Sequence, residues 1–160
     1  MGVDCKVTLS PGTRVRDVAL ALGAALGCKK TWGGTSDGKT RWVEVEGVRV
    51  RCDGMPGCAS IECGERWFCY HFEYGADGAR GVTLRSFAEN IAVGRKLAEF
   101  FGGSVEPNDW EGEVVWSTPY RTDCHAEDGE EWDAFQARLF AVEPVTAEEI
   151  AECQTWAGYK

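Results

Sequence analysis

The segment SFAENIAVGRKLAEFFGG at residues 86–103 carries the most complete set of helix signals in the chain. Ser86 and Glu89 have the spacing of a capping box, in which each side chain can satisfy a free backbone N–H at a helix start. The glycine pair that follows supplies the residue type that ends helices. Gly94 would let a neighbouring element approach closely. Apolar residues cover more than half of the helix surface: Phe87, Ile91, Val93, Leu97, Ala98, Phe100 and Phe101. The pattern predicts a largely buried central helix, with Asn90 in a narrow exposed strip.

Two further elements are predicted before this helix. Residues 3–9 alternate between apolar and polar side chains, which predicts a half-buried strand. After a Pro-Gly turn, Thr13 can cap a second helix. The apolar stripe of that helix consists of Val15, Val18, Leu22 and Leu26. Its spacing predicts a second helix in the core.

The sequence predicts a series of strands in the middle of the chain. Residues 41–52 alternate as a strand, but the alternation shifts by one residue at Gly47. Either a bulge at this glycine or a tight turn that splits the run into two strands would explain the shift. Cys58–Cys63 and Arg66–Tyr74 predict two more strands, and the second has aromatic residues on one face. We expect these rings to pack against the central helix.

The last third of the chain predicts short strands at 104–105 and 113–117, followed by two helices. Asp128 with Glu131, and Thr146 with Glu149, have capping-box spacing at the two helix starts. The order of elements predicts an α/β protein of the α+β type, with a mainly antiparallel sheet, helices packed on one face and two C-terminal helices. We expect a single domain over residues 1–160, with residues 121–160 as an alternative helical appendage.

The 160-residue chain has a formal net charge of −9, and the acidic residues are concentrated in its second half. Residues 1–80 contain 11 Lys and Arg against 10 Asp and Glu, whereas residues 81–160 contain 6 against 16. Such a surface disfavours direct binding to nucleic acid or to an anionic membrane and favours a protein partner with a basic surface. No apolar run reaches the ~18 residues of a membrane helix. Because no secretory signal opens the chain, we expect its eight cysteines to be thiols in the cytoplasm.

A cluster of zinc-binding residue types occurs in the predicted strands, namely Cys58, Cys63, Cys69 and His71. The cluster lacks the CxxC pair of structural zinc sites, although neighbouring strands would bring Cys63 and Cys69 close together. Buried reduced thiols explain the same residues without a metal. We therefore expect no cofactor, with zinc as the alternative.

Catalysis by thiol and imidazole groups is disfavoured by the spacing of these residues. Cys69, His71 and Glu73 share one face of a strand, where successive residues stand about 6.5–7 Å apart, too far for a direct hydrogen bond. Cys124 and His125 are adjacent, and neighbours on an extended chain point to opposite sides. We therefore predict no catalytic residues and interpret the chain as a non-enzyme.

Two surfaces are candidates for binding. The first combines an exposed tryptophan with an acid-rich stretch and consists of Trp110, Glu127, Asp128, Glu130, Glu131 and Asp133. Acids in a first helical turn are also explained by the helix dipole. The second consists of Arg49, Arg51 and His71, which could hold an anion such as a nucleotide. A solvated strand face explains this second set equally well.

Four segments carry a family resemblance: MGVDCKVTL and TRVRDVALALGAALG near the start, and YHFEYG and NIAVGRKLAEFFGGSVEPND later in the chain. Together they resemble small α/β proteins encoded by bacteriophages and prophages, which largely lack an assigned function. The matching parts cover about half of the chain and are core and turn residues. The resemblance implies a phage-type accessory protein in the host cytoplasm and assigns no functional residue.

The sequence thus predicts a non-enzymatic, cytoplasmic accessory protein of phage or prophage type. We expect it to bind a protein through its acidic surface, for example to inhibit a basic host or defence protein. The alternatives are a small-ligand or nucleotide-binding protein and a zinc-stabilised structural module.

Overall fold

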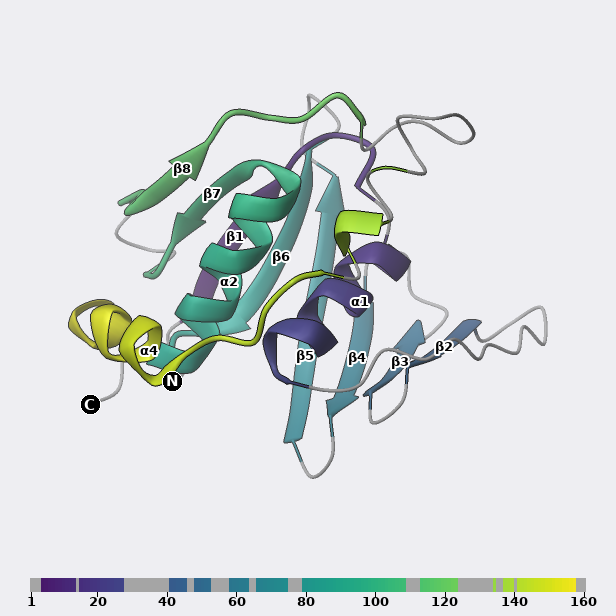
Figure 1. Ribbon diagram of the computed structural model, residues 1–160, viewed down its shortest axis with the longest axis horizontal. Coiled ribbons are helices and arrows are strands. Elements are labelled where there is room, and N and C mark those ends of the chain that lie inside the picture. Colours follow the sequence, from purple (N-terminus) through teal and green to yellow (C-terminus); the bar gives the residue numbers. More distant parts are fainter. Residues whose placement is uncertain are drawn as a thin grey trace.

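Antiparallel strands form one sheet in the computed structural model, and helices α1 and α2 lie on the same side of it (Figure 1). The structure describes residues 4–13, 15–27, 41–45, 48–52, 58–63, 66–74, 79–108, 113–123, 134, 137–139 and 141–157. For the strands between residues 41 and 74 it describes the backbone and its pairing. The α+β class, with a mainly antiparallel sheet and helices on one face, is confirmed.

The described strands form a single eight-stranded sheet with the order β2-β3-β4-β5-β6-β1-β7-β8. Each neighbouring pair is antiparallel. The strands are β1 (Asp4–Leu9), β2 (Arg41–Val45), β3 (Val48–Cys52), β4 (Cys58–Cys63), β5 (Arg66–Tyr74), β6 (Arg80–Arg85), β7 (Gly103–Glu106) and β8 (Trp116–Thr118). Strands β2 to β6 follow one another as neighbours, whereas β1 lies between β6 and β7. The first strand is therefore an inner strand of the sheet.

The helices cover different parts of the same face. Helix α2 (Ala88–Phe101) connects β6 to β7 and packs against β1, β6 and β7. Helix α1 (Val15–Ala25) packs against β2, β3 and α2. The short helix α4 (Ala147–Cys153) packs on α2 and continues into the 3-10 turn η3 (Gln154–Trp156). The sequence predicted α2 over the aromatic strand β5. Among the strands it instead packs mainly on β1 and β7, because β1 is inserted between the two strands that α2 connects.

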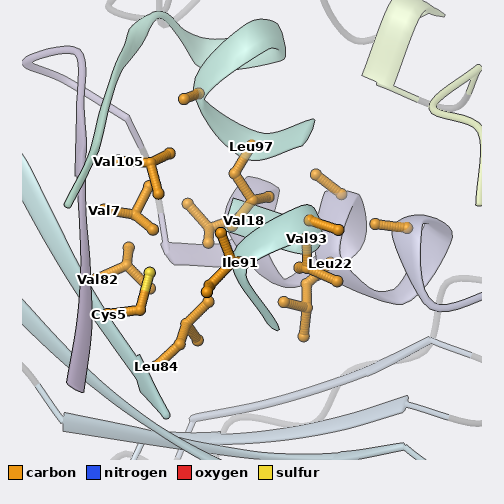
Figure 2. Packing of buried hydrophobic residues seen from close by; sticks show 14 of the residues in the cluster. Cys5, Val7, Val18, Leu22, Val82, Leu84, Ile91, Val93, Leu97 and Val105 are labelled. Atoms are coloured by element: carbon orange, nitrogen blue, oxygen red, sulfur yellow. The ribbon is translucent and has the colours of Figure 1, made fainter. Parts of the chain in front are cut away.

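Apolar side chains from the sheet and from both long helices form the core (Figure 2). Val7 of β1 and Val82 of β6 are fully buried opposite Ile91 and Leu97 of α2. Leu22 of α1 is 1% exposed, so the predicted second core helix is confirmed. The same cluster includes Cys5, Leu9, Val18, Leu84, Val93, Phe101 and Val105. Burial of this apolar surface is the main force that holds the helices on the sheet.

The register of the middle strands decides between the two interpretations of residues 41–52. Val45 at the end of β2 pairs with Val48 at the start of β3. A tight turn thus splits the segment into two strands, and the bulge interpretation is wrong. Strand β6 was not predicted, because only Val82 and Leu84 alternate within a segment that also contains Gly81.

The start of α2 differs from the sequence prediction. The N-cap is Phe87 rather than Ser86, and Phe87 makes no side-chain cap. Strand β6 runs to Arg85, and the N–H of Phe87 donates to the Arg85 carbonyl (2.8 Å), so the chain turns sharply between strand and helix. Asn90, expected to be exposed, is only 6% exposed because its amide donates to the same carbonyl (3.0 Å). Asn90 therefore closes the turn.

The last carbonyl groups of α2 are bonded by residues far away in sequence. An α-helix leaves its final carbonyl groups without helical partners. Three side chains donate hydrogen bonds to the carbonyl groups of residues 98, 100, 101 and 102, namely Ser10, Thr118 and Arg121. Gly102 then turns the chain into β7 with a positive φ of 75°. The C-terminal end of α2 is thus tied to the ends of β1 and β8.

The C-terminal segment is packed onto the rest of the chain. The capping box of Thr146 and Glu149 is confirmed, with both reciprocal hydrogen bonds at 3.1 Å. Cys153 of α4 is 1% exposed and belongs to the main core, as does Leu139, which is 2% exposed. The Val145 N–H donates to the Ala25 carbonyl at the end of α1 (2.8 Å). Among the described residues, no helix is both long and apolar enough to cross a bilayer.

Candidate functional site

The sheet has a second face, opposite the one that α1 and α2 cover. In β1, Cys5, Val7 and Leu9 are buried, whereas Asp4, Lys6 and Thr8 between them are partly exposed. Strand β7 shows the same alternation. Across the strands, Asp4 pairs with Arg85, and their side chains form an ion pair at 3.5 Å. We call this the uncovered face, since no helix of the described part of the chain packs on it in Figure 1.

Strand pairing extends the two faces from β6 to β3. Phe72 of β5 pairs with Val82, which is buried under α2, so the position of Phe72 belongs to the helix-covered face. Successive residues of a strand alternate between faces. Positions 67, 69, 71 and 73 of β5 therefore belong to the uncovered face. Through the β4–β5 and β3–β4 pairings, so do positions 58, 60 and 62 of β4 and positions 49 and 51 of β3.

The three residues predicted to hold an anion thus occupy one face of the sheet. Arg49 and Arg51 are in β3, and His71 is in β5. Arg49 is paired with Glu44 on one side and with Glu62 on the other, so acidic positions flank it on both neighbouring strands.

Arg51 occupies a different environment in the register. It is directly paired with Trp42 and Ser60, whereas Glu44 and Glu62 are only diagonal to it in the register. Arg51 is therefore the better candidate of the two arginines for a bound anion.

The same register separates the cysteines. Cys63 pairs with Arg66, whereas Cys69 pairs with Ser60. Because positions 60 and 63 of one strand lie on opposite faces, Cys63 and Cys69 are not cross-strand neighbours, and that expectation was wrong. Cys58 pairs directly with His71. Cys58, Cys69 and His71 share the uncovered face, and Cys63 belongs to the helix-covered face.

A network of charged side chains joins α2, α4 and β8 on the other side of the molecule. The Arg95 guanidinium bonds the Glu152 carboxylate at 2.8 Å and lies 4.0 Å from the ring centroid of Trp116. Burial opposes the charged form of Arg95, but the hydrogen bond to Glu152 and the charge of Glu99 outweigh it and raise the pKa of Arg95. Lys96 pairs with Glu149 at 3.2 Å. These groups are engaged with one another and serve to fasten α4.

A second ionic cluster lies beside the C-terminal end of α2. Asp123 accepts hydrogen bonds from Arg121 at 2.9 and 2.6 Å and from Arg138 at 2.9 Å. The hydrogen bond from Arg121 is the main cause that lowers the pKa of Asp123, against the opposing effect of burial. Arg121 also donates to the helix, so this cluster has a structural role.

The predicted acidic surface lies outside the described residues, which include none of Trp110, Glu127, Asp128, Glu130, Glu131 and Asp133. Its role in binding stays a prediction. Among the side chains that the structure describes, no three His, Cys, Asp or Glu residues are grouped as metal ligands. That set does not include the side chains of β4 and β5. Comparisons of the chain with protein-family models, curated proteins and solved structures gave no significant match.

Proposed function

We propose that the protein is a non-enzymatic binding protein that takes a small anionic ligand on the uncovered face of strands β3 to β5. Arg51 and His71 would be the principal contacts, with Arg49 in a supporting role. The observation that carries the proposal is the strand register, which assigns all three positions to one face. Two cationic or hydrogen-bonding residue types at positions on one face of a sheet are the composition of an anion site.

The spacing of the two principal residues suits a ligand of phosphate size or larger. Arg51 is in β3 and His71 is in β5, with β4 between them. The position of β5 in line with Arg51 is Cys69, and His71 follows it by two residues. The Cα atoms of Arg51 and His71 are therefore about 12 Å apart, given strand spacings near 4.8 Å and a rise near 3.3 Å per residue. The long arginine side chain can span much of this distance. In this proposal a phosphate or carboxylate group of a small molecule bridges the two positions.

The experiment is a binding titration with phosphate, ATP, GTP and a dicarboxylate. Calorimetry measures the heat of binding, and thermal unfolding measures the ligand-induced shift in Tm. Arg51→Ala should abolish most of the binding signal, whereas Arg49→Ala should reduce it less because acidic positions flank Arg49. Arg85→Ala is the matched control, since Arg85 is on the same face but pairs with Asp4 at 3.5 Å. No signal for any ligand, or equal losses in the Arg51 and Arg85 variants, would contradict the proposal.

Protein binding through an acidic surface is a second candidate. Exposed carboxylates of the described C-terminal segment support it, because Glu143 and Glu148 add negative charge beyond the acid-rich stretch. In this proposal, a phage-type cytoplasmic protein covers a basic surface of a host protein. Capture from a host lysate by wild type should be lost when Glu130, Glu131 and Asp133 are changed to Lys. Unchanged capture would exclude the acidic surface as the cause.

A further inference from the structure

Three residues of zinc-binding type occupy neighbouring register positions on the uncovered face of the β4–β5 hairpin. Cys58 is directly opposite His71 in the strand register. Cys69 precedes His71 by two residues on β5, so it is on the same face and diagonal to Cys58. The three positions thus form a compact triangle on two neighbouring strands.

The spacing of the triangle separates two possible uses of its thiols. Directly opposed residues have Cβ atoms about 4.5–5.5 Å apart, and diagonal neighbours are about 7–8 Å apart. Disulfides need Cα atoms within about 6.8 Å, so Cys58 and Cys69 are too far apart to be bridged without backbone movement. A zinc ion with bonds of about 2.3 Å to sulfur and about 2.0 Å to nitrogen can span residues at this spacing. The register therefore favours a shared ion over a disulfide.

The residue types agree with the spacing. Thiolate and imidazole groups together are the ligands that zinc selects over magnesium or calcium. Three protein ligands leave one position of a tetrahedral ion open, as in zinc sites that bind an exogenous molecule.

We propose that Cys58, Cys69 and His71 bind one Zn²⁺ ion through two thiolates and one imidazole, with the fourth position open to an anionic ligand. Both thiols lose their protons as the ion binds, so two protons are released to solvent. Arg51 pairs with Ser60, which in turn pairs with Cys69, so it is on the same face as the open position. The inference deepens the proposed function, because His71 then acts on the anion through the ion and Arg51 acts on it directly.

The first experiment measures the metal alone. Protein prepared with a reductant and stripped with a chelator is titrated with Zn²⁺, and native mass spectrometry gives the stoichiometry. Wild type should bind about one equivalent, and Co²⁺ should give the visible absorption of tetrahedral thiolate coordination. Cys58→Ser, Cys69→Ser and His71→Gln should each weaken binding by about 100-fold or more. Cys63→Ser is the matched control, since the register puts position 63 on the other face, and it should bind normally.

A second measurement uses only wild type and does not depend on how the variants fold. Alkylation followed by peptide mapping should show that zinc protects Cys58 and Cys69 and leaves the reactivity of Cys63 unchanged. Less than a tenth of an equivalent of bound zinc, or equal protection of all three cysteines, would overturn the metal site. Anion titrations with and without zinc then separate the two proposals. Zinc binding without any anion binding defeats the proposed function and the open fourth position but leaves the metal site, whereas anion binding by a protein that takes up no zinc defeats the metal site alone.

Discussion

Gly94 of α2 lies directly against Val7 of β1, so that a Cβ atom at position 94 would stand 2.8 Å from Val7 Cγ2. This contact is shorter than real side chains tolerate, and Val7 is fully buried. The glycine therefore sets how closely the central helix approaches the middle of the sheet. The sequence-based expectation of a close approach at Gly94 is confirmed.

Replacing this glycine should destabilise the protein even though alanine is the better helix former. Gly94→Ala gains about 1 kcal/mol of helix propensity, but overpacking a filled core costs about 1–3 kcal/mol. Val7 is β-branched and has little freedom to rotate away. We expect a net loss of about 1 kcal/mol in the free energy of unfolding, measured by urea denaturation. Adding Val7→Ala should relieve the clash, so the two substitutions should be less harmful together than their sum. Strict additivity would contradict the proposed contact.

Arg95 should contribute more to stability than an exposed ion pair does. Its side chain is 25% exposed and contacts Glu99, Glu152 and Trp116. We expect Arg95→Gln to cost about 1–2 kcal/mol, because a partly buried cation–π contact adds to the ion pairs. Arg85→Gln is the control, since Arg85 and Asp4 are 61% and 44% exposed and the pair is 3.5 Å long. It should change the unfolding free energy by less than about 0.5 kcal/mol. Equal effects of the two variants would show that the network does not hold α4.

The β4–β5 hairpin shows how much of the candidate site the sequence contains. Both strands have the bounds expected from alternation, and only two residues separate Cys63 from Arg66. Counting outward from so short a connection puts Cys58 opposite His71, because hairpin register follows from loop length. The expectation that paired Cys63 with Cys69 failed because it used the adjacency of the strands without their register. The pairing of Cys58 with His71 could therefore have been predicted from the sequence alone.

Other features depend on contacts that no local pattern reports. The capping box at Thr146 was predictable because its two partners are three residues apart. The residues that bond the end of α2 are not, since Ser10 is 91 residues from Phe101. The insertion of β1 between β6 and β7 is equally remote in sequence, and it decides which strands α2 covers. Local signals give elements and caps, whereas the neighbours of each element are fixed by the packing of the whole chain.

The hydroxyl of Thr118 should stabilise the protein, because it forms hydrogen bonds at the C-terminal end of α2. Thr118 Oγ1 donates to the Ala98 carbonyl at 2.7 Å and accepts from the Gly103 N–H at 3.3 Å. Thr118→Val keeps the shape of the side chain but leaves a donor and an acceptor unpaired, at a cost of about 1–3 kcal/mol. Thr118→Ser keeps the hydroxyl and should lose much less. Urea unfolding of the two variants measures the difference, and equal losses would mean that the hydroxyl contributes no more to stability than the methyl group does.

The free energy of unfolding should fall at alkaline pH because the Cys5 thiol is buried. This thiol is fully buried in β1, and burial, with smaller effects from Cys153, Glu106 and Asp4, raises its pKa to about 12. An unfolded thiol ionises near pH ~8.5. Below that pH both states are neutral and the contribution to stability is complete. As the pH rises further, only the unfolded state loses its proton, so stability falls until the folded thiol ionises as well.

The test compares wild type with Cys5→Ala by urea unfolding at about pH 8 and about pH 10.5. Wild type should lose more stability between the two pH values than the variant, because the variant has no thiol at position 5 to ionise in its unfolded state. Other groups that titrate in this range affect both proteins alike, so the difference isolates Cys5. Native-state alkylation of Cys5 should also be slow at the lower pH, since the thiol is 0% exposed. Parallel stability losses, or rapid alkylation, would mean that β1 opens to solvent at this residue.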